Sequence, residues 1–343
     1  MSRYRTALET AAVYVGAIVG AGFASGREIY IFFVRRGDPG LAAAVAAGLL
    51  LGAAAALFLP PALRAGATDY SGMCRYVGGR LGRTIEAVLS LFLFAGLAVM
   101  LAAGATVTAS YLPLSYSAAV LAMALVTAGF VVAGPRGVTG VNNWLVPYLT
   151  LAVLAVSVTA LNDAPPAGAN AAAELCAPAP AISSLLLYVG YNFVTGAAVL
   201  ISLPPASARQ RAGGALLGGV SLSVMLGVAA LAMRPLGATI AHQPLPLLDL
   251  ARGLGPRWAL LYVPAIGFAI LTTAVADAYA LARRFSPTRP WLAGVAAVAL
   301  AVPLANRGFV TLVDNLYPLL GLIGLLFVVL AIWRILRPKT RLS

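Results

Sequence analysis

Charge is scarce in this sequence, and so are the residue types that build most catalytic and metal-binding sites. Only 10% of the 343 residues are charged, against roughly a quarter in ordinary soluble domains. One histidine and two cysteines are too few for a cysteine- or histidine-rich metal cage. The sequence also contains no G-x-x-x-x-G-K-[ST], H-E-x-x-H or G-x-S-x-G motif. These absences argue against nucleotide hydrolysis and against an intramembrane enzyme, so we expect no catalytic residues.

Apolar residues are abundant instead, at 61% of the chain with a mean hydropathy of +0.94. Uncharged windows long enough to cross a bilayer, which takes about 20 residues, recur at 39–63, 87–135, 137–162, 175–208, 212–233, 258–276, 290–306 and 315–333. The window 87–135 contains the turn-like segment SYLPLSYS and therefore predicts two helices. With the opening apolar run, the sequence predicts an all-α polytopic membrane protein of ten helices. We expect one transmembrane domain over residues 1–343.

The net charge of +13 is of the kind that attracts nucleic acid, but its distribution follows membrane topology. If the N-terminus is cytoplasmic, only seven of the 23 lysine and arginine residues fall outside or near the outer face. These seven are Arg27, Arg35, Arg36, Arg234, Arg252, Arg257 and Arg307. Cytoplasmic enrichment of Lys and Arg predicts that both termini lie inside. The lipid bilayer, and no nucleic acid, is therefore the expected partner.

Three short patterns recur at an offset of about 170 residues. VTGVNN from Val138 returns as VTLVDN from Val310, and FASG from Phe23 returns as FVTG from Phe193. A Leu-Gly pair at 81 also returns at 254. Each repeat, about 8–161 and about 180–337, then holds five helices. An odd number of crossings inverts the second copy, which is a layout typical of secondary transporters.

The segment GAGFASG, from Gly20 to Gly26, weakens the first predicted helix at its middle. Its spacing does not match the G-x-G-x-x-G dinucleotide fingerprint, and no strand precedes it. Close packing of small residues against a neighbouring helix is one alternative. The other is an interrupted helix, whose free backbone groups are tolerated only around a cavity. The echo in the sixth predicted helix, with Gly190 and Gly196, favours interruption of both helices.

GAGFASGREI followed by an aromatic pair resembles the first-helix signature of the YkvI-like bacterial membrane proteins. The likeness continues through VTGVNN before Pro147 and through TTAVADAYAL in the eighth predicted helix. It implies a permease of the amino acid–polyamine–organocation superfamily in the bacterial inner membrane. The implied fold is a LeuT-type inverted repeat of five plus five helices, with helices one and six interrupted.

The resemblance also implies a candidate ion site between the first and eighth helices. In sodium-coupled members of the fold, backbone carbonyls and two hydroxyls hold Na⁺, and no carboxylate is required. The matching positions here are Gly16, Val19, Ala269, Thr272 and Thr273. The alternative is that the threonine hydroxyls bond to their own helix backbone. We expect no cofactor other than this candidate Na⁺.

Four ionisable residues lie within or near predicted helices, where charge usually indicates function. They are Arg27, Glu28, Asp277 and Asp314. An Arg27–Asp314 pair would close an outer gate, as in some relatives of the fold. Glu28 is a candidate proton carrier or a structural link between helices. Asp277 is a candidate proton carrier or a counter-ion for Arg283 and Arg284.

The predicted function is secondary active transport of a small polar or zwitterionic, amino-acid-like solute. The expected pocket residues are Ala21, Gly22, Phe23, Ser25, Tyr188, Gly190, Tyr191, Asn192, Phe193 and Thr195. They are mostly neutral and aromatic, which favours a zwitterion held by backbone dipoles over a polyanion. Na⁺ coupling is narrowly favoured over H⁺ coupling, and the alternative function is a receptor that keeps the fold without transport. The sequence carries no signal for an oligomeric state.

Overall fold

The computed structural model of the chain describes residues 2–134, 136–163, 180–203, 207–286 and 288–336. Over these residues the secondary structure is helical, with no strand. The helices are α1 (Ser2–Ile18), α2 (Ala21–Ser25), α3 (Arg27–Phe32), η1 (Val34–Arg36), α4 (Asp38–Arg64), α5 (Tyr70–Gly78), η2 (Gly79–Leu81), α6 (Gly82–Tyr111), α7 (Tyr116–Ala133), α8 (Arg136–Asp163), α10 (Ala181–Ile201), α11 (Ala208–Met233), η3 (Arg234–Ile240), α12 (Pro246–Gly253), α13 (Pro256–Phe285), α14 (Pro290–Ala305) and α15 (Phe309–Leu336).

Eight helical segments of the described chain are long and apolar enough to cross a membrane. Two shorter apolar helices, Ala7–Ile18 and Pro290–Ala305, accompany them. The ten predicted helices coincide in position with these ten segments. The division of window 87–135 is confirmed, because α6 ends at Tyr111 and Ser115 caps α7 by accepting from Ala118 N at 3.3 Å. How many helices span the bilayer, and the inverted repeat, stay predictions.

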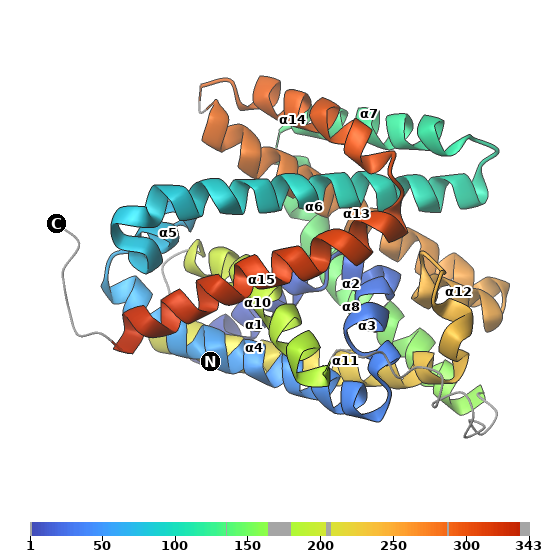
Figure 1. Cartoon of the computed structure of the whole chain (residues 1–343), viewed down its shortest axis with the longest axis horizontal. Coiled ribbons are helices and arrows are strands. Elements are labelled where there is room, and N and C mark those ends of the chain that lie inside the picture. Colours follow the sequence, from blue (N-terminus) through green and yellow to red (C-terminus); the bar gives the residue numbers. More distant parts are fainter. Residues whose placement is uncertain (1, 135, 164–179, 204–206, 287, 337–343) are drawn as a thin grey trace.

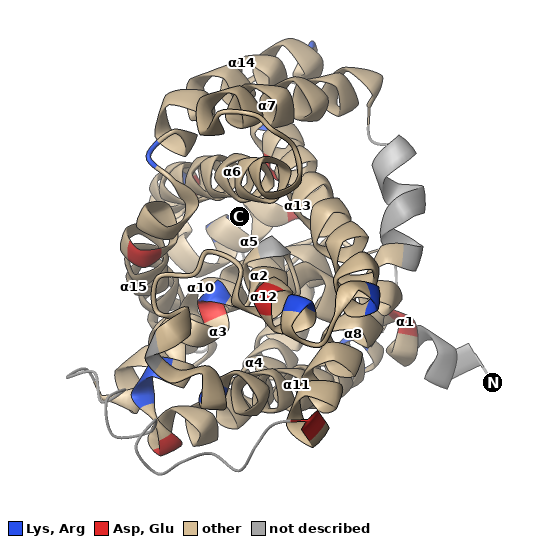
Figure 2. Cartoon of the chain, turned by 90° about the vertical axis from the view of Figure 1, so that its right-hand side faces the viewer, with Lys and Arg blue, Asp and Glu red and all other residues tan. Residues whose placement is uncertain are grey.

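The long helices run roughly along the longest axis of the molecule, with short helices at its two ends (Figure 1). The short helix α5 lies at one end and α12 at the other, while α7 and α14 form a layer along one side. Viewed from the α12 end, the helix walls carry few charged residues, and charges gather around α3 and α12 (Figure 2). Apolar walls with charge at the ends are the pattern that a bilayer requires.

The two halves of the chain meet where α4 crosses α11, with almost no side chain between their backbones. A Cβ placed on Gly48 would lie 2.1 Å from Ser223 N, and one on Gly219 would lie 2.6 Å from the Cα of Gly52. Gly48 and Gly219 are separated by the same offset of about 170 residues as the repeated motifs. Contact between equivalent positions is what a twofold-related repeat would produce, and the duplication itself stays a prediction.

Replacing Gly48 with alanine should lower the thermal stability of the purified protein in detergent. The added methyl would collide with backbone rather than with a movable side chain, and overpacking of this kind costs about 1–3 kcal/mol. Gly129→Ala is the matched control, because a Cβ there meets no atom within 4 Å. It should leave the unfolding midpoint unchanged or raise it slightly. Equal midpoints for the two variants would contradict the close α4–α11 crossing.

The prediction that helix six is interrupted was wrong, because α10 runs unbroken from Ala181 to Ile201. Its glycines serve close packing instead. A Cβ on Gly190 would lie 2.5 Å from Leu325 N of α15, and one on Gly196 would lie 2.4 Å from the Tyr14 ring of α1. Glycine lets the backbones approach, which is the small-residue packing typical of membrane helices. The sequence signal in helix six was therefore one of packing.

Candidate functional site

The first helix is interrupted as predicted, at two places. Helix α1 ends at Ile18, and Gly20 is extended with φ −86° and ψ −167°. Gly20 N donates to Ile18 O at 2.8 Å and not to the Gly16 carbonyl, so Gly16 O loses its ordinary helical partner. After one turn of α2, Gly26 takes a left-handed conformation with φ 79°, and α3 begins.

Local hydrogen bonds and a neighbouring helix fix the second break. Ser25 Oγ donates to Gly22 O at 2.7 Å and accepts from Arg27 N at 3.1 Å, which satisfies backbone groups left free by the turn. A Cβ on Gly26 would lie 2.9 Å from Leu247 N of α12. Gly26 is thus required both by its positive φ and by close approach. Helix α12 covers the break directly.

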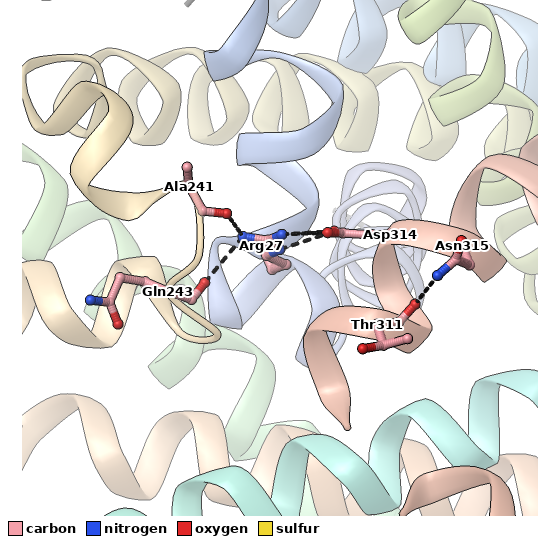
Figure 3. Close-up of polar contacts among 6 residues, drawn as sticks. All are labelled: Arg27, Ala241, Gln243, Thr311, Asp314 and Asn315. Carbon is pink, nitrogen blue, oxygen red and sulfur yellow. Dashed lines mark hydrogen bonds and ion pairs between the residues drawn. The ribbon is translucent and has the colours of Figure 1, made fainter. Parts of the chain in front are cut away.

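The predicted pair between Arg27 and Asp314 is present, and Arg27 has further partners (Figure 3). Arg27 Nη2 donates to both carboxylate oxygens of Asp314, at 2.8 and 2.6 Å. Its Nη1 donates to the backbone carbonyls of Ala241, at 2.5 Å, and Gln243. Arg27 is 2% exposed and so joins α3, α15 and the segment before α12 in one buried cluster. Its role as an outer gate stays a prediction.

Glu28 follows Arg27 directly but contacts a different part of the molecule. A Cβ on Gly22 would lie 1.7 Å from Glu28 Oε1 and 2.7 Å from the Tyr317 hydroxyl. The carboxylate therefore lies against the backbone of α2, within hydrogen-bonding reach of the Tyr191 and Tyr317 hydroxyls. Glu28 is 3% exposed and its Oε2 has no hydrogen-bond partner. Among the described residues it forms no ion pair.

Aromatic rings surround this carboxylate, with Tyr191 of α10 at their centre. The Tyr191 ring lies 5.3 Å from Tyr317, 5.8 Å from Tyr188, 6.2 Å from Phe92 and 6.3 Å from Phe32, centroid to centroid. The Tyr188 hydroxyl is buried with no hydrogen-bond partner. The rings come from α3, α6, α10 and α15, so the four helices meet at one aromatic site beside the helix-one break.

Of the predicted pocket residues, Gly22, Tyr188 and Tyr191 lie at this site. The other predicted pocket residues make contacts elsewhere or have no contact at this site. Asn192 Nδ2 donates to Tyr188 O at 3.1 Å, and Phe193 packs against Phe58. Gly190 contacts α15, Ser25 holds the turn, Phe23 is fully buried, and Thr195 is partly buried with no role visible. The side chain of Ala21 lies outside the described residues.

Tyr317, Phe32 and Phe92 were not predicted. Tyr317 precedes Pro318 in the repeated VTLVDN segment, and Phe32 is the first of the aromatic pair after GREI. Both signals were visible in the sequence. Phe92 sits in a long apolar helix with no distinguishing pattern.

One of the two threonines of the candidate ion site faces the break in helix one, and the ion site itself stays a prediction. A Cβ on Gly20 would lie 3.5 Å from Thr273 Oγ1, so this hydroxyl faces the break after α1. Thr272 Oγ1 instead donates to Phe268 O at 2.9 Å and lies 3.2 Å from Ala269 O. With the freed Gly16 carbonyl and Val19 in the break, an oxygen-only donor set suits a hard monovalent cation. In the described chain no three His, Cys, Asp or Glu side chains cluster to hold another metal.

Asp277 lies one helical turn beyond Thr273 on α13 and faces α6. A Cβ on Gly96 would lie 2.8 Å from Asp277 Oδ2. The expectation that Asp277 neutralises Arg284 is not met, because Arg284 pairs with Glu86 at 3.6 Å. Ser71 Oγ also donates to Glu86 Oε1, at 2.8 Å, so this pair ties α5, α6 and α13 together near the α5 end.

Burial differs between the two sides of the break. Arg27, Glu28, Ile29 and Tyr30, on the α12 side, are all buried. Gly16, Gly20, Thr273 and Asp277, on the α5 side, are partly exposed. The residues on the α12 side of the break are therefore the more deeply buried ones.

Sequence and structure comparisons agree with this architecture. The chain is 26% identical to the membrane protein YkvI of Bacillus subtilis (strain 168), over 94% of each chain. It is 23% identical to YyaD of the same organism, over 95% of this chain and 96% of that protein. No family model matches. Among solved structures, the inward-facing conformation of Mhp1 superposes with a TM-score of 0.61 at 14% identity, covering 93% of this chain and 73% of that one. The chain thus resembles YkvI along nearly its whole length and shares the fold of Mhp1, which is of the LeuT type.

Proposed function

We propose that the protein is a secondary active transporter of a small polar solute that carries an amino group. The observation that carries the proposal is the doubly interrupted first helix, whose break holds a buried carboxyl group without an ionic partner among aromatic rings. Interrupted helices near the bilayer midplane are the sites at which transporters of this architecture hold substrate and ion. We place the protein in the bacterial inner membrane with both termini in the cytoplasm.

Alternating access is the mechanism that the uneven burial of the site supports. The Arg27 cluster and α12 cover one side, which the predicted topology puts outside, while Thr273 and Asp277 are partly exposed on the other. We assign this arrangement to an inward-facing state. Transport then requires release of the Arg27 cluster and closure of the cytoplasmic side around the same residues.

Ion coupling is the finer part of the proposal, and we favour Na⁺ over H⁺. Thr273 Oγ1 faces Gly20 in the break after α1, and the Gly16 and Val19 carbonyls and the α13 backbone at Ala269 would supply the remaining oxygens. An ion bound there would link the helix-one break to α13 and stabilise the state in which the break is arranged for substrate. When bound, Na⁺ would supply a positive charge beside the helix-one break, and the protein would supply and position the oxygen ligands of the ion.

Thr273→Val should remove most of the dependence of substrate affinity on Na⁺. Valine keeps the shape of threonine and removes one oxygen ligand of the ion. Coupling between ion and substrate is typically worth 1–3 kcal/mol, or about 5–150-fold in substrate affinity. Thr272→Val is the matched control and should have the smaller effect, because that hydroxyl bonds to its own helix. Substrate titrations in Na⁺ and K⁺ buffers measure both. Equal affinities in the two buffers for the wild-type protein would remove the sodium site and leave proton coupling.

The experiment that tests the function begins with ligand identification. A thermal-shift screen of amines and amino acids detects ligands, because binding to the folded state raises the unfolding midpoint by mass action. Uptake of the stabilising solute into proteoliposomes under an imposed Na⁺ or proton gradient then tests transport. Gradient-driven accumulation supports the proposal, and specific binding with no flux in any gradient would instead indicate a receptor.

A further inference from the structure

The helix-one break holds a buried carboxyl group that has no ionic partner among the described residues. Glu28 is buried with one carboxylate oxygen unpartnered and has no ion pair among the described residues. Its neighbour Arg27 cannot compensate it, because the guanidinium is fully occupied by Asp314, Ala241 and Gln243. A buried carboxylate without a cation is costly. A bound ligand with a positive charge would supply the missing partner.

The site offers little to a ligand carboxylate. Because α10 is continuous, it presents no free N–H groups of the kind that a broken helix six would have supplied. The helices α2 and α3 are only 5 and 6 residues long, too short for a strong dipole. The side chains at the site are the Glu28 carboxylate, tyrosine hydroxyls and aromatic rings. The expectation of a zwitterion held by backbone dipoles loses its structural basis here.

The aromatic rings favour a cation. Tyr191 contacts four other rings, and Tyr188 contributes a buried hydroxyl without a partner. Ring faces attract ammonium groups, by about 0.5–1 kcal/mol at exposed sites and 2 or more when desolvated. A carboxylate with several rings around it is thus complementary to an ammonium group on an apolar body.

We propose that the site takes an organic cation: a small primary or secondary amine without a carboxylate group. Glu28 is the counter-ion of the ammonium group, and the Tyr191 ring lies against that ammonium group. The Tyr188 hydroxyl accepts a hydrogen bond from one ammonium N–H. This assignment rests on the proposed transport function for its site, and it replaces the amino-acid-like solute with a solute of net positive charge.

Two matched sets of solutes test the charge requirement. The first set is alanine, ethylamine and propionate, and the second is leucine, 3-methylbutylamine and 4-methylpentanoate. Within each set the carbon skeleton is kept while the carboxylate or the amine is removed. Calorimetric titration of the purified full-length protein should show that the amine binds at least roughly tenfold more tightly than its amino acid, because a buried unpaired carboxylate is disfavoured.

Glu28→Gln tests the counter-ion, and Glu9→Gln, the same substitution at an exposed position of α1, is its control. Loss of a buried charge partner corresponds to roughly 30-fold weaker amine binding or more. Tyr191→Leu removes the aromatic face and should weaken amine binding by roughly 30-fold, since a desolvated cation–ring contact is worth about 2 kcal/mol or more. Glutamine is isosteric and can still accept from Tyr191 and Tyr317, so folding should be retained.

Each result decides between the assignments. Amino acids that bind as tightly as their amines, carboxylates that bind best, or no binding by any of the six solutes would overturn the organic-cation assignment. Unchanged amine affinity in Glu28→Gln would overturn it as well. Uptake of the bound solute into proteoliposomes is measured separately. Amine binding without uptake contradicts transport and leaves the organic-cation assignment standing. Uptake of an amino acid supports transport and overturns the organic-cation assignment.

Discussion

Replacing Gly22 with leucine should abolish ligand binding while the protein still folds. The position accepts no side chain, because a Cβ would lie 1.7 Å from Glu28 Oε1 and 2.7 Å from the Tyr317 hydroxyl. Leucine would displace the carboxylate from α2 and separate it from its tyrosine partners. We expect affinity to fall by more than roughly 100-fold, the range seen when a buried charged contact is removed. Titration calorimetry with the solute found in the thermal-shift screen measures the loss.

The control for this variant is Gly267→Leu on α13. A Cβ at Gly267 meets no atom within 4 Å, so leucine there adds apolar surface without a clash. Both variants should elute as monodisperse protein, and only Gly22→Leu should lose binding. Gly22→Ala adds only a Cβ, so it tests whether any side chain at this position is harmful or only a large one. We expect Gly22→Ala already to weaken ligand binding. If folded Gly22→Leu binds with wild-type affinity, the site does not lie at the helix-one break.

Asp314→Asn should open the outer end of the molecule. The substitution would leave the Arg27 guanidinium with the carbonyls of Ala241 and Gln243 but without its charged partner. Breaking a buried ion pair costs 3–5 kcal/mol, and because the Asp314 side chain is 36% exposed we expect less, about 1–2 kcal/mol. That is roughly tenfold in the population of the opened state. Amide hydrogen exchange in α3 and α12 should rise accordingly.

Asp249→Asn provides the comparison on the same face. Asp249 pairs with Arg252 at 3.0 Å within α12, and both side chains are partly exposed. This pair joins two residues of the same short helix and no other element, and partly exposed pairs contribute little, so exchange should stay at the wild-type rate. Burial raises the pKa of Asp249 despite Arg252, in keeping with a weak pair. Equal exchange in Asp314→Asn and Asp249→Asn would show that Arg27 does not hold the outer end closed.

The interruption of helix one could be predicted from the sequence, and the continuity of helix six could not. Both helices carry glycines at their centres, and glycine weakens any helix by about 1 kcal/mol. In helix one that weakness becomes a break, with Gly20 extended and Gly26 left-handed. In helix six the same residue type allows contact with α15 and α1. Only the position of the neighbouring helices separates the two outcomes.

Some contacts among the candidate site residues could be predicted from the sequence and others could not, because they depend on how the helices pack. The Arg27–Asp314 pair followed from the resemblance, and the structure places the two side chains together. The position of Glu28 against Gly22 depends on the left-handed turn at Gly26, which reverses the chain between them. Tyr188 and Tyr191 were expected in the pocket. Phe92 reaches Tyr191 through helix packing over a long sequence separation and carries no local pattern, so the sequence indicated part of the aromatic site and not its full set of rings.

Counterflow in proteoliposomes tests the central claim, that the site beneath the Arg27 cluster is reached alternately from the two sides of the membrane. Vesicles are loaded with unlabelled ligand and diluted into a trace of labelled ligand without any ion gradient. We predict transient accumulation of label inside vesicles with the wild-type protein or with Gly267→Leu, and none with Gly22→Leu. Saturable binding by the wild-type protein without accumulation of label would contradict alternating access and identify the protein as a receptor.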